Sequence, residues 1–214
     1  MFIEYLQSDL RFFLAVVITV IVSITVHELA HGVAAVALGD RTPIESGHMT
    51  LNPVVHLGVF SIIMLLLAGI AWGAMPVNPD RLNRRTRFGE ALVALAGPVS
   101  NVLLAAVAVV AVGVWVRFGD GDPLPTRAEN LRYFLGVFAV TNVSLAIFNL
   151  IPLPPLDGSR ILANLVPAYA RVLESLGTSG AYMVVFIVVF ANAGRLITPA
   201  AVEAVRWGVR TVAG

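Results

Sequence analysis

Long apolar runs alternate with short polar segments along the whole chain. About 20 consecutive apolar residues cross a hydrocarbon core close to 30 Å thick, so a run of this length predicts a membrane helix. Runs of this kind are found at residues 12–38, 57–74, 91–116, 131–150 and 181–197. The pattern predicts an all-α polytopic membrane protein with about four to six membrane helices.

The second apolar run is the least regular. It is only about 18 residues long and contains Gly58, Gly69 and Gly73, so it either spans the bilayer or enters it and returns. Residues 76–89, which follow it, carry four arginines against the single Asp80. By the positive-inside rule we expect this loop on the cytoplasmic side.

Other segments interrupt the helical pattern. Residues 41–56 are polar and broken by prolines and glycines, which predicts a loop or a short β-hairpin. Three prolines within residues 152–155 require the chain to unwind after the fourth apolar run. Residues 159–176 predict a pair of short helices near the interface, and residues 200–212 an interfacial amphipathic helix.

Composition agrees with a membrane protein and limits its chemistry. The chain is 58% hydrophobic and 13% charged, against about 25% charged residues in soluble domains. The net charge of +1 and the lack of a basic stripe argue against nucleic acid as a partner. Without cysteine, only histidine and carboxylate side chains are left to hold a metal. We expect one membrane-embedded domain over residues 1–214, with its core at 10–165.

The first apolar run contains His27, Glu28 and His31 in the spacing His-Glu-x-x-His. On a helix, residues four apart differ by about 40° in azimuth, so both imidazoles point the same way and can bind one zinc ion. Glu28 can then reach a water at the metal without being a ligand. The alternative is two core histidines at this spacing by chance, for which a shuffled chain gives a probability of about 0.002.

Two polar residues further along have more than one interpretation. Asp157 follows the proline-rich break, where it either reaches back to the metal or caps a helix that starts at Ser159. Asn142, inside the fourth apolar run, is interpreted as an ordinary hydrogen-bonding residue between helices.

Several motifs occur together in one order. They are His27-Glu28-x-x-His31, Asn52-Pro53-x-x-His56, Met75-Pro76-Val77-Asn78-Pro79, Ala96-Gly97-Pro98 and Asn149-Leu150-x-Pro152-x-x-Pro155-x-Asp157-Gly158. Between about residues 25 and 162 the chain thereby resembles the site-2 protease family of intramembrane zinc metalloproteases, in its compact branch without a PDZ domain. In that branch an acidic residue often follows the second motif directly, whereas Leu57 and Gly58 follow it here.

The resemblance assigns roles to individual residues. It implies that His27, His31 and Asp157 hold one zinc ion per chain and that Glu28 is the catalytic base. Asn149 matches an asparagine that contacts the extended substrate backbone. His56 is either a second substrate-binding residue or a loop histidine, and His48 has no assigned role.

The same resemblance sets the expected partners and location. It implies protein substrates with transmembrane segments, cleaved within or next to the membrane helix, and a multi-pass protein in the plasma (cytoplasmic) membrane of a prokaryote. Two alternatives remain: a metal or proton transporter that uses the His-Glu-His cluster, and a catalytically inactive relative that binds membrane helices.

The depth of the ligands decides between the two arrangements of residues 57–74. If this run spans, His31 lies near the outer face while Asp157, which follows an inward-running helix, lies near the cytoplasm. If it is re-entrant, the first helix runs inwards and His31 lies about seven residues, or roughly 10 Å, from the cytoplasmic end of that helix. The sequence therefore predicts an outer N-terminus, a re-entrant segment and a site nearer the cytoplasm.

Overall fold

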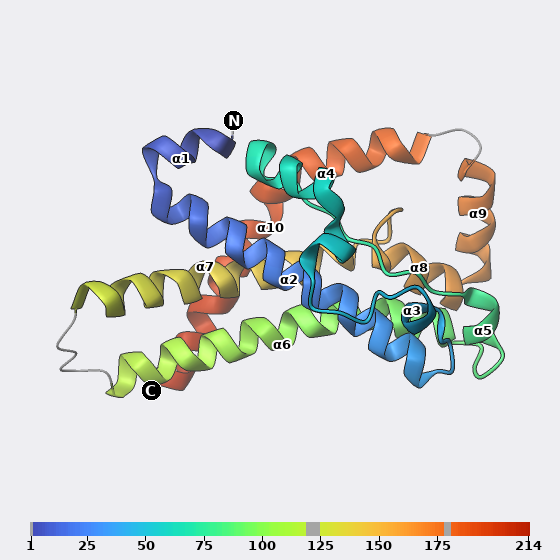
Figure 1. Ribbon diagram of the computed structural model, residues 1–214, viewed down its shortest axis with the longest axis horizontal. Helices are drawn as coiled ribbons and strands as arrows, with labels where there is room; N and C mark the ends of the chain where they lie inside the picture. Colours follow the sequence, from blue (N-terminus) through green and yellow to red (C-terminus); the bar gives the residue numbers. More distant parts are fainter. Residues whose placement is uncertain (1, 119–124, 178–180) are drawn as a thin grey trace.

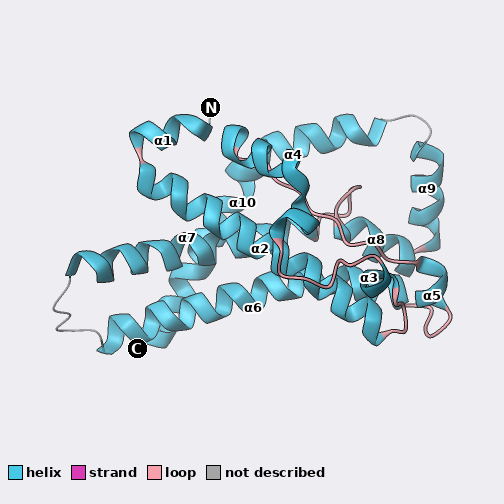
Figure 2. Cartoon of the chain, in the orientation of Figure 1, coloured by secondary structure: helices cyan, strands magenta, loops and turns pink. Residues whose placement is uncertain are grey.

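A computed structural model describes residues 2–118, 125–177 and 181–214, and every regular element within these ranges is helical (Figure 2). The elements are η1 (Phe2–Glu4), α1 (Tyr5–Ser8), α2 (Leu10–Ala37), α3 (Thr42–Glu45), α4 (Pro53–Ala68), α5 (Pro79–Asn83), α6 (Gly89–Phe118), α7 (Pro125–Asn149), α8 (Asp157–Leu165), α9 (Pro167–Gly177) and α10 (Ala181–Ala213). The all-α prediction is confirmed, and no strand that could belong to a PDZ domain occurs in the described ranges.

Four of the described helices are long and apolar enough to cross a bilayer. They cover Leu10–Ala37, Gly89–Phe118, Arg127–Asn149 and Tyr182–Ala213. Helix α6 contacts α2, α7 and α10, and α2 also contacts α7. Along the long axis of Figure 1, α2 and α7 run in one direction and α6 in the other, with α3, α5 and α8 gathered at one end. The chain is a multi-pass membrane protein with a helical bundle as its centre.

Helix α4 is shorter than a span, and the chain turns back after it. Its last residue is followed by Gly69 at φ 73°, and the next residues return along the helix. The Ser61 hydroxyl donates to the Trp72 carbonyl and accepts from the Trp72 N–H, and the Ala74 N–H donates to the His56 carbonyl at 3.0 Å. This geometry has the form of the re-entrant alternative, because the segment ends at the level where it began.

The segment after α2 does not form the β-hairpin that was the alternative to a loop. Asp40 accepts hydrogen bonds from the Thr42 N–H at 3.0 Å and from the Thr42 hydroxyl, which starts the helical turn α3 instead. Pro43 follows in that turn and has no N–H to offer a strand partner. Among the described residues this region is therefore a short helix and loop.

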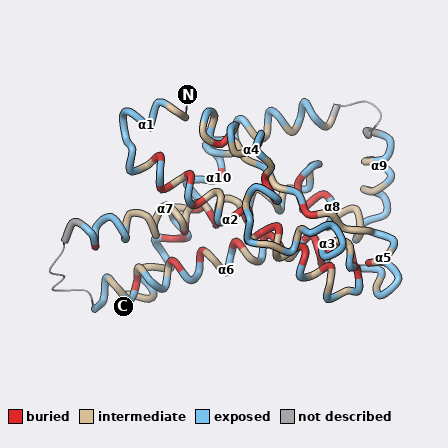
Figure 3. The backbone as a smooth tube through the Cα atoms, in the orientation of Figure 1, coloured by how far each residue is buried: buried red, intermediate tan, exposed pale blue. Residues whose placement is uncertain are grey.

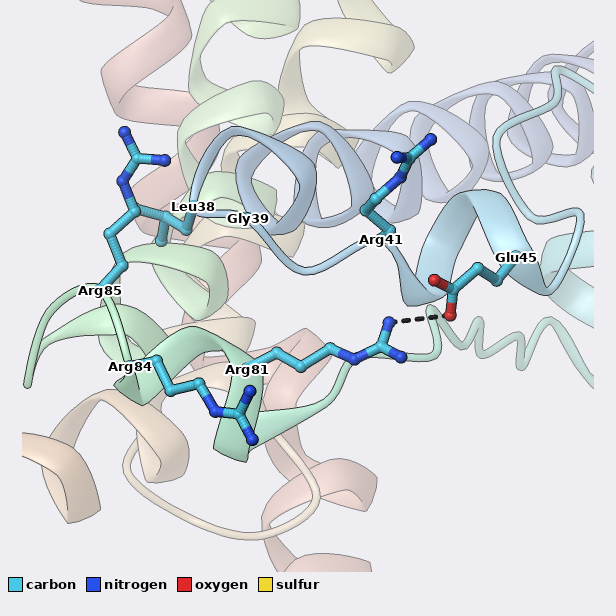
Figure 4. A pocket seen from close by; sticks show the side chains of 7 residues that line it. All are labelled: Leu38, Gly39, Arg41, Glu45, Arg81, Arg84 and Arg85. Carbon is cyan, nitrogen blue, oxygen red and sulfur yellow. Dashed lines mark hydrogen bonds and ion pairs between the residues drawn. The ribbon is translucent and has the colours of Figure 1, made fainter.

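A hollow of about 490 Å³ lies beside this turn, between the end of α2 and the arginine-rich segment around α5 (Figure 4). Arg81 on one wall pairs with Glu45 at 2.8 Å and lies 3.7 Å from the buried carboxylate of Asp40. Asp40 also accepts the Asn78 N–H at 2.6 Å. These contacts join the loop after α2 to the segment that leads into α5.

The C-terminal prediction is corrected in one respect. Residues 159–176 form the expected pair of short helices, but residues 200–212 are the second half of α10 rather than a separate interfacial helix. Their apolar stripe packs inside the bundle, where Val205 contacts Ala108 of α6 and Ala139 of α7. The apolar stripe of an amphipathic helix can face either lipid or protein, and here it packs against α6 and α7.

Candidate metal centre

Helix α2 carries the two histidines and the glutamate among its buried residues. Buried stretches recur along this helix where it runs through the bundle (Figure 3). The imidazole rings of His27 and His31 have centroids 4.6 Å apart and are nearly perpendicular. Only 8% of His27, 7% of His31 and 7% of Glu28 is exposed. The spacing of four residues brings the imidazoles together as predicted.

Asp157 meets both imidazoles. Its Oδ2 lies 3.1 Å from His27 Nε2 and 3.4 Å from His31 Nε2, and one ligand atom from each of the three residues lies within 4.8 Å of the others. Helix α8 begins at Asp157 itself and its N-cap is Leu156, so Asp157 does not cap a helix starting at Ser159. The capping alternative is therefore wrong.

The break before α8 brings Asp157 back toward α2. Residues 150–156 are not helical, as the three prolines require. A Cβ at Gly158 would clash with the Leu150 carbonyl oxygen more closely than any side chain tolerates. Glycine at this position lets the start of α8 lie against the end of the unwound segment.

The outer nitrogen of each imidazole is held by another helix. His31 Nδ1 lies 2.7 Å from the Val93 carbonyl oxygen, which can only accept, so His31 Nδ1 carries the hydrogen. His27 Nδ1 lies 2.6 Å from Asn101 Oδ1. Both Nε2 atoms therefore present lone pairs toward the Asp157 carboxylate, and such a set of converging acceptors suits a bound cation.

Two glycines shape the space around these groups. A Cβ at Gly97 of α6 would lie 2.5 Å from His27 Nε2 and from His31 Nε2. A Cβ at Gly73, in the returning segment after α4, would lie 2.5 Å from Glu28 Oε1. The small residues at Ala96–Pro98 thus allow the close packing that the sequence indicated.

The other predicted site residues lie outside the metal cluster. The Asn149 amide donates to the Leu145 carbonyl of its own helix at 3.0 Å. His56 is 3% exposed, its Nε2 donates to the Thr50 carbonyl at 2.7 Å, and its Nδ1 has no hydrogen-bond partner in the described residues. His48 contacts Ser46, and its ring lies 6.4 Å from that of His56.

Sequence reasoning missed Asn101 as part of the site. The interhelical role of Asn142 is confirmed, because its side chain joins Ser23 on α2 to Asn101 on α6. The available signal was an asparagine within an apolar run, three positions after Pro98, since buried amides in membrane helices need partners.

Comparison with known proteins agrees with the motifs. The family model described as peptidase family M50 matches residues 15–119 and 122–192. The protein named "Putative zinc metalloprotease YwhC", from Bacillus subtilis (strain 168), is 39% identical over 190 residues, which cover 88% of this chain and 85% of that protein.

Two further relatives are more distant. "Putative zinc metalloprotease Rip2" of Mycolicibacterium smegmatis is 30% identical over 197 residues, covering 88% of this chain and 68% of the relative. "Putative zinc metalloprotease MJ0611" of Methanocaldococcus jannaschii is 30% identical over 140 residues, covering 64% and 62%. No solved structure gives a significant match. The family match and these identities show that the chain belongs to peptidase family M50, the site-2 protease family.

Proposed function

We propose that this protein is an intramembrane zinc metalloprotease that hydrolyses a peptide bond within or next to a transmembrane helix of its substrate. The observation that carries the proposal is the convergence of His27 Nε2, His31 Nε2 and Asp157 Oδ2 at one buried point. Membership of family M50 and the zinc metalloprotease names of the relatives support the same activity.

The residues at this point fit one zinc ion per chain. Zinc prefers imidazole nitrogen and carboxylate oxygen where thiolate is absent, and catalytic zinc sites commonly have three protein ligands and one open position. His27, His31 and Asp157 would be those ligands. When bound there, zinc supplies Lewis-acid activation of a water and of the scissile carbonyl.

Glu28 is the proposed general base. It follows His27 on the same helix, is buried beside the ligands and is approached by the backbone at Gly73. Its carboxylate would take a proton from the attacking water and deliver it to the nitrogen of the leaving amine.

The substrate must unwind locally before it can be cut, because a helix hides its carbonyls in hydrogen bonds. Asn149 borders the unwound segment that ends at Asp157, and we propose that its amide contacts the extended substrate backbone. His56 is a second candidate, because its buried Nδ1 lacks a partner in the described residues. The proposed partners are therefore membrane proteins with transmembrane segments, within the lipid bilayer.

The proposed orientation has the N-terminus outside and the active site nearer the cytoplasm. The arginines of residues 81–87 support a cytoplasmic loop, and α2 separates the N-terminus from that end of the molecule (Figure 1). The chain has no cysteine, so single cysteines at Gln7 and Asn83 can be labelled without background. Labelling from opposite sides is expected, and labelling from one side would contradict the orientation.

The deciding experiment compares the wild type with Glu28→Gln. Metal analysis of the purified proteins should give the same zinc content, because Glu28 is not a proposed ligand. Loss of a general base lowers cleavage by about 10²–10⁴-fold. Membrane proteomes of cells expressing each form should therefore differ by fragments that end in or beside transmembrane segments.

The same comparison separates the two alternatives. A metal or proton transporter should retain part of its activity in Glu28→Gln, and an inactive relative should give no Glu28-dependent fragments at all. Unchanged zinc content in both His27→Ala and Asp157→Ala would contradict the assigned metal site.

A further inference from the structure

A series of hydrogen bonds between buried polar side chains runs from His27 on α2 through α6 and α7 and returns to α2 at Ser23. His27 Nδ1 lies 2.6 Å from Asn101 Oδ1, Asn101 Nδ2 donates to Asn142 Oδ1 at 2.9 Å, and Asn142 Nδ2 donates to Ser23 Oγ at 2.9 Å. Asn101, Asn142 and Ser23 are fully buried. Their side chains come from α6, α7 and α2, in that order.

The contact between Asn142 and the Phe138 carbonyl fixes which atom donates in each of these hydrogen bonds. Asn142 Nδ2 also lies 2.9 Å from the Phe138 carbonyl oxygen. A backbone carbonyl can only accept, so the nitrogen end of the Asn142 amide must face it. The Asn142 oxygen then faces Asn101, which requires the nitrogen end of the Asn101 amide at that contact.

The same logic continues to the metal ligand. With its nitrogen committed to Asn142, the Asn101 amide presents only its oxygen to His27. An oxygen acceptor requires the hydrogen on His27 Nδ1, which leaves the lone pair on Nε2. This is the tautomer that can bind a metal on the side of Asp157.

We infer that Asn101 and Asn142 are positioning residues that select the metal-binding tautomer of His27. The Phe138 carbonyl sets the direction of the whole series of hydrogen bonds, because it can only accept. Asn101 acts directly on His27, and Asn142 acts only through the orientation of the Asn101 amide. The inference rests on the proposed function in that it takes His27 as a zinc ligand.

The roles of the two residues differ in a way that can be measured. Without Asn142, the Asn101 amide can turn over and present its nitrogen to His27, which favours the hydrogen on Nε2 and opposes metal binding. An aspartate at position 101 has two equivalent acceptor oxygens, so its orientation needs no control. It also has no donor for Asn142 Oδ1, so removal of Asn142 should do no harm in that background.

The test measures zinc affinity of the detergent-solubilised full-length protein by competition with a chelator. The variants are Asn101→Leu, Asn101→Asp, Asn142→Leu and the double variant Asn101→Asp/Asn142→Leu. Asn192→Leu is the matched control, since the Asn192 amide donates to its own helix at the Val188 carbonyl. Thermal unfolding of each variant, with zinc removed, reports whether it is folded.

Partners behind a metal-binding histidine are worth about 10–100-fold in affinity. We expect Asn101→Leu and Asn142→Leu each to bind zinc about 10-fold or more weakly, and Asn101→Asp to stay within about 3-fold of wild type. The double variant should bind as Asn101→Asp does, and the control as wild type.

Equal losses from Asn142→Leu in both backgrounds would overturn the inference, because Asn142 would then act through packing. Wild-type affinity in Asn101→Leu would overturn it as well. If the folded wild-type protein binds no zinc, the proposed metal site itself is wrong, and that result is distinct from a failure of the coupling alone.

Discussion

Asp40 and Asp157 both lie at junctions between helix and loop, Asp40 fully buried and Asp157 largely buried, but their surroundings are opposite. Asp40 is surrounded by donors: the N–H groups of Thr42 and Asn78, a hydroxyl and the Arg81 guanidinium. Asp157 instead faces the Nε2 atoms of two histidines whose Nδ1 atoms already have partners.

This difference distinguishes a structural carboxylate from a candidate ligand. Asp40 is satisfied by the protein itself, since hydrogen bonds to its charge offset its burial. Around Asp157 three acceptors converge, and only a cation or an added proton can satisfy them together. The number of donors around a buried carboxylate is therefore more informative than its burial.

The largest predicted effect comes from removing each carboxylate in turn. Asp157→Ala should weaken zinc binding by at least about 100-fold, because loss of a ligand costs no less than loss of a partner behind a ligand. Asp40→Ala should leave zinc affinity within about 3-fold of wild type while lowering the free energy of unfolding by about 3 kcal/mol. Chelator competition measures the zinc affinity, and thermal unfolding measures the stability. Loss of zinc from Asp40→Ala alone would reverse the comparison.

The next prediction adds a methyl group beside the two histidines, at Gly97. Gly97→Ala places a Cβ 2.5 Å from both Nε2 atoms and should weaken zinc binding by about 10-fold or more, because the imidazoles must move. The matched control is Gly136→Ala on α7, where an added Cβ meets nothing within 4 Å. Zinc affinity that changes equally in both variants would point to a general effect of alanine in these helices.

Gly73→Ala should affect the base and spare the ligands. Its Cβ would lie 2.5 Å from Glu28 Oε1 and 2.7 Å from Ile24 Cγ2, so the carboxylate must shift. We expect zinc affinity within about 3-fold of wild type and cleavage reduced by about 10-fold or more, since small displacements of a catalytic group are costly. Normal cleavage of a substrate found through its Glu28-dependent fragments would show that the base tolerates the shift.

Asn149 tests whether the region around Asp157 also receives substrate. Asn149→Ala should retain zinc, because the Asn149 amide bonds only to its own helix in the described contacts. Cleavage should fall by roughly 10-fold or more, on the order of 1.4 kcal/mol in the barrier. Turnover at the wild-type rate would reduce Asn149 to a packing residue.

Much of the fold followed from the lengths of the apolar runs. A helix in lipid must be apolar over about 20 residues, so α2 and α6 were predicted within about two residues of both ends. Helix α7 begins earlier than predicted, at Pro125 instead of residue 131, because its first turns are polar. The second half of α10 was assigned to the interface because its stripe does not reveal which surface covers it. The hairpin alternative failed because the Asp40 side chain, rather than a neighbouring strand, accepts the local hydrogen bonds.

The candidate site was also predicted only in part from the sequence. His27 and His31 were paired by spacing within one helix, and Asp157 was indicated by the proline break before it. Asn101 was missed because its importance depends on contacts with residues 74 and 41 positions away, at His27 and Asn142. Spacing along one helix is visible in a sequence, whereas the register between two helices is set by their packing.

The smallest predicted effect is a pH dependence of stability that arises from Asp40. Burial would raise the pKa of Asp40, but hydrogen bonds from Asn78 and Thr42 and the charge of Arg81 outweigh it and hold the pKa below its usual value. A lowered pKa in the folded state means that the contribution to stability is complete above the unfolded value of about 3.9 and is lost as the pH falls through the folded value. Asp40→Asn cannot accept all of these hydrogen bonds at any pH, so it should be less stable than wild type by about 1–2 kcal/mol at neutral pH. Thermal unfolding in detergent between pH 7 and pH 3 should show a constant difference down to about pH 4 that shrinks below it. A difference that instead grows in acid would mean that Asp40 gains a proton on folding, and the contrast with Asp157 would then need another cause.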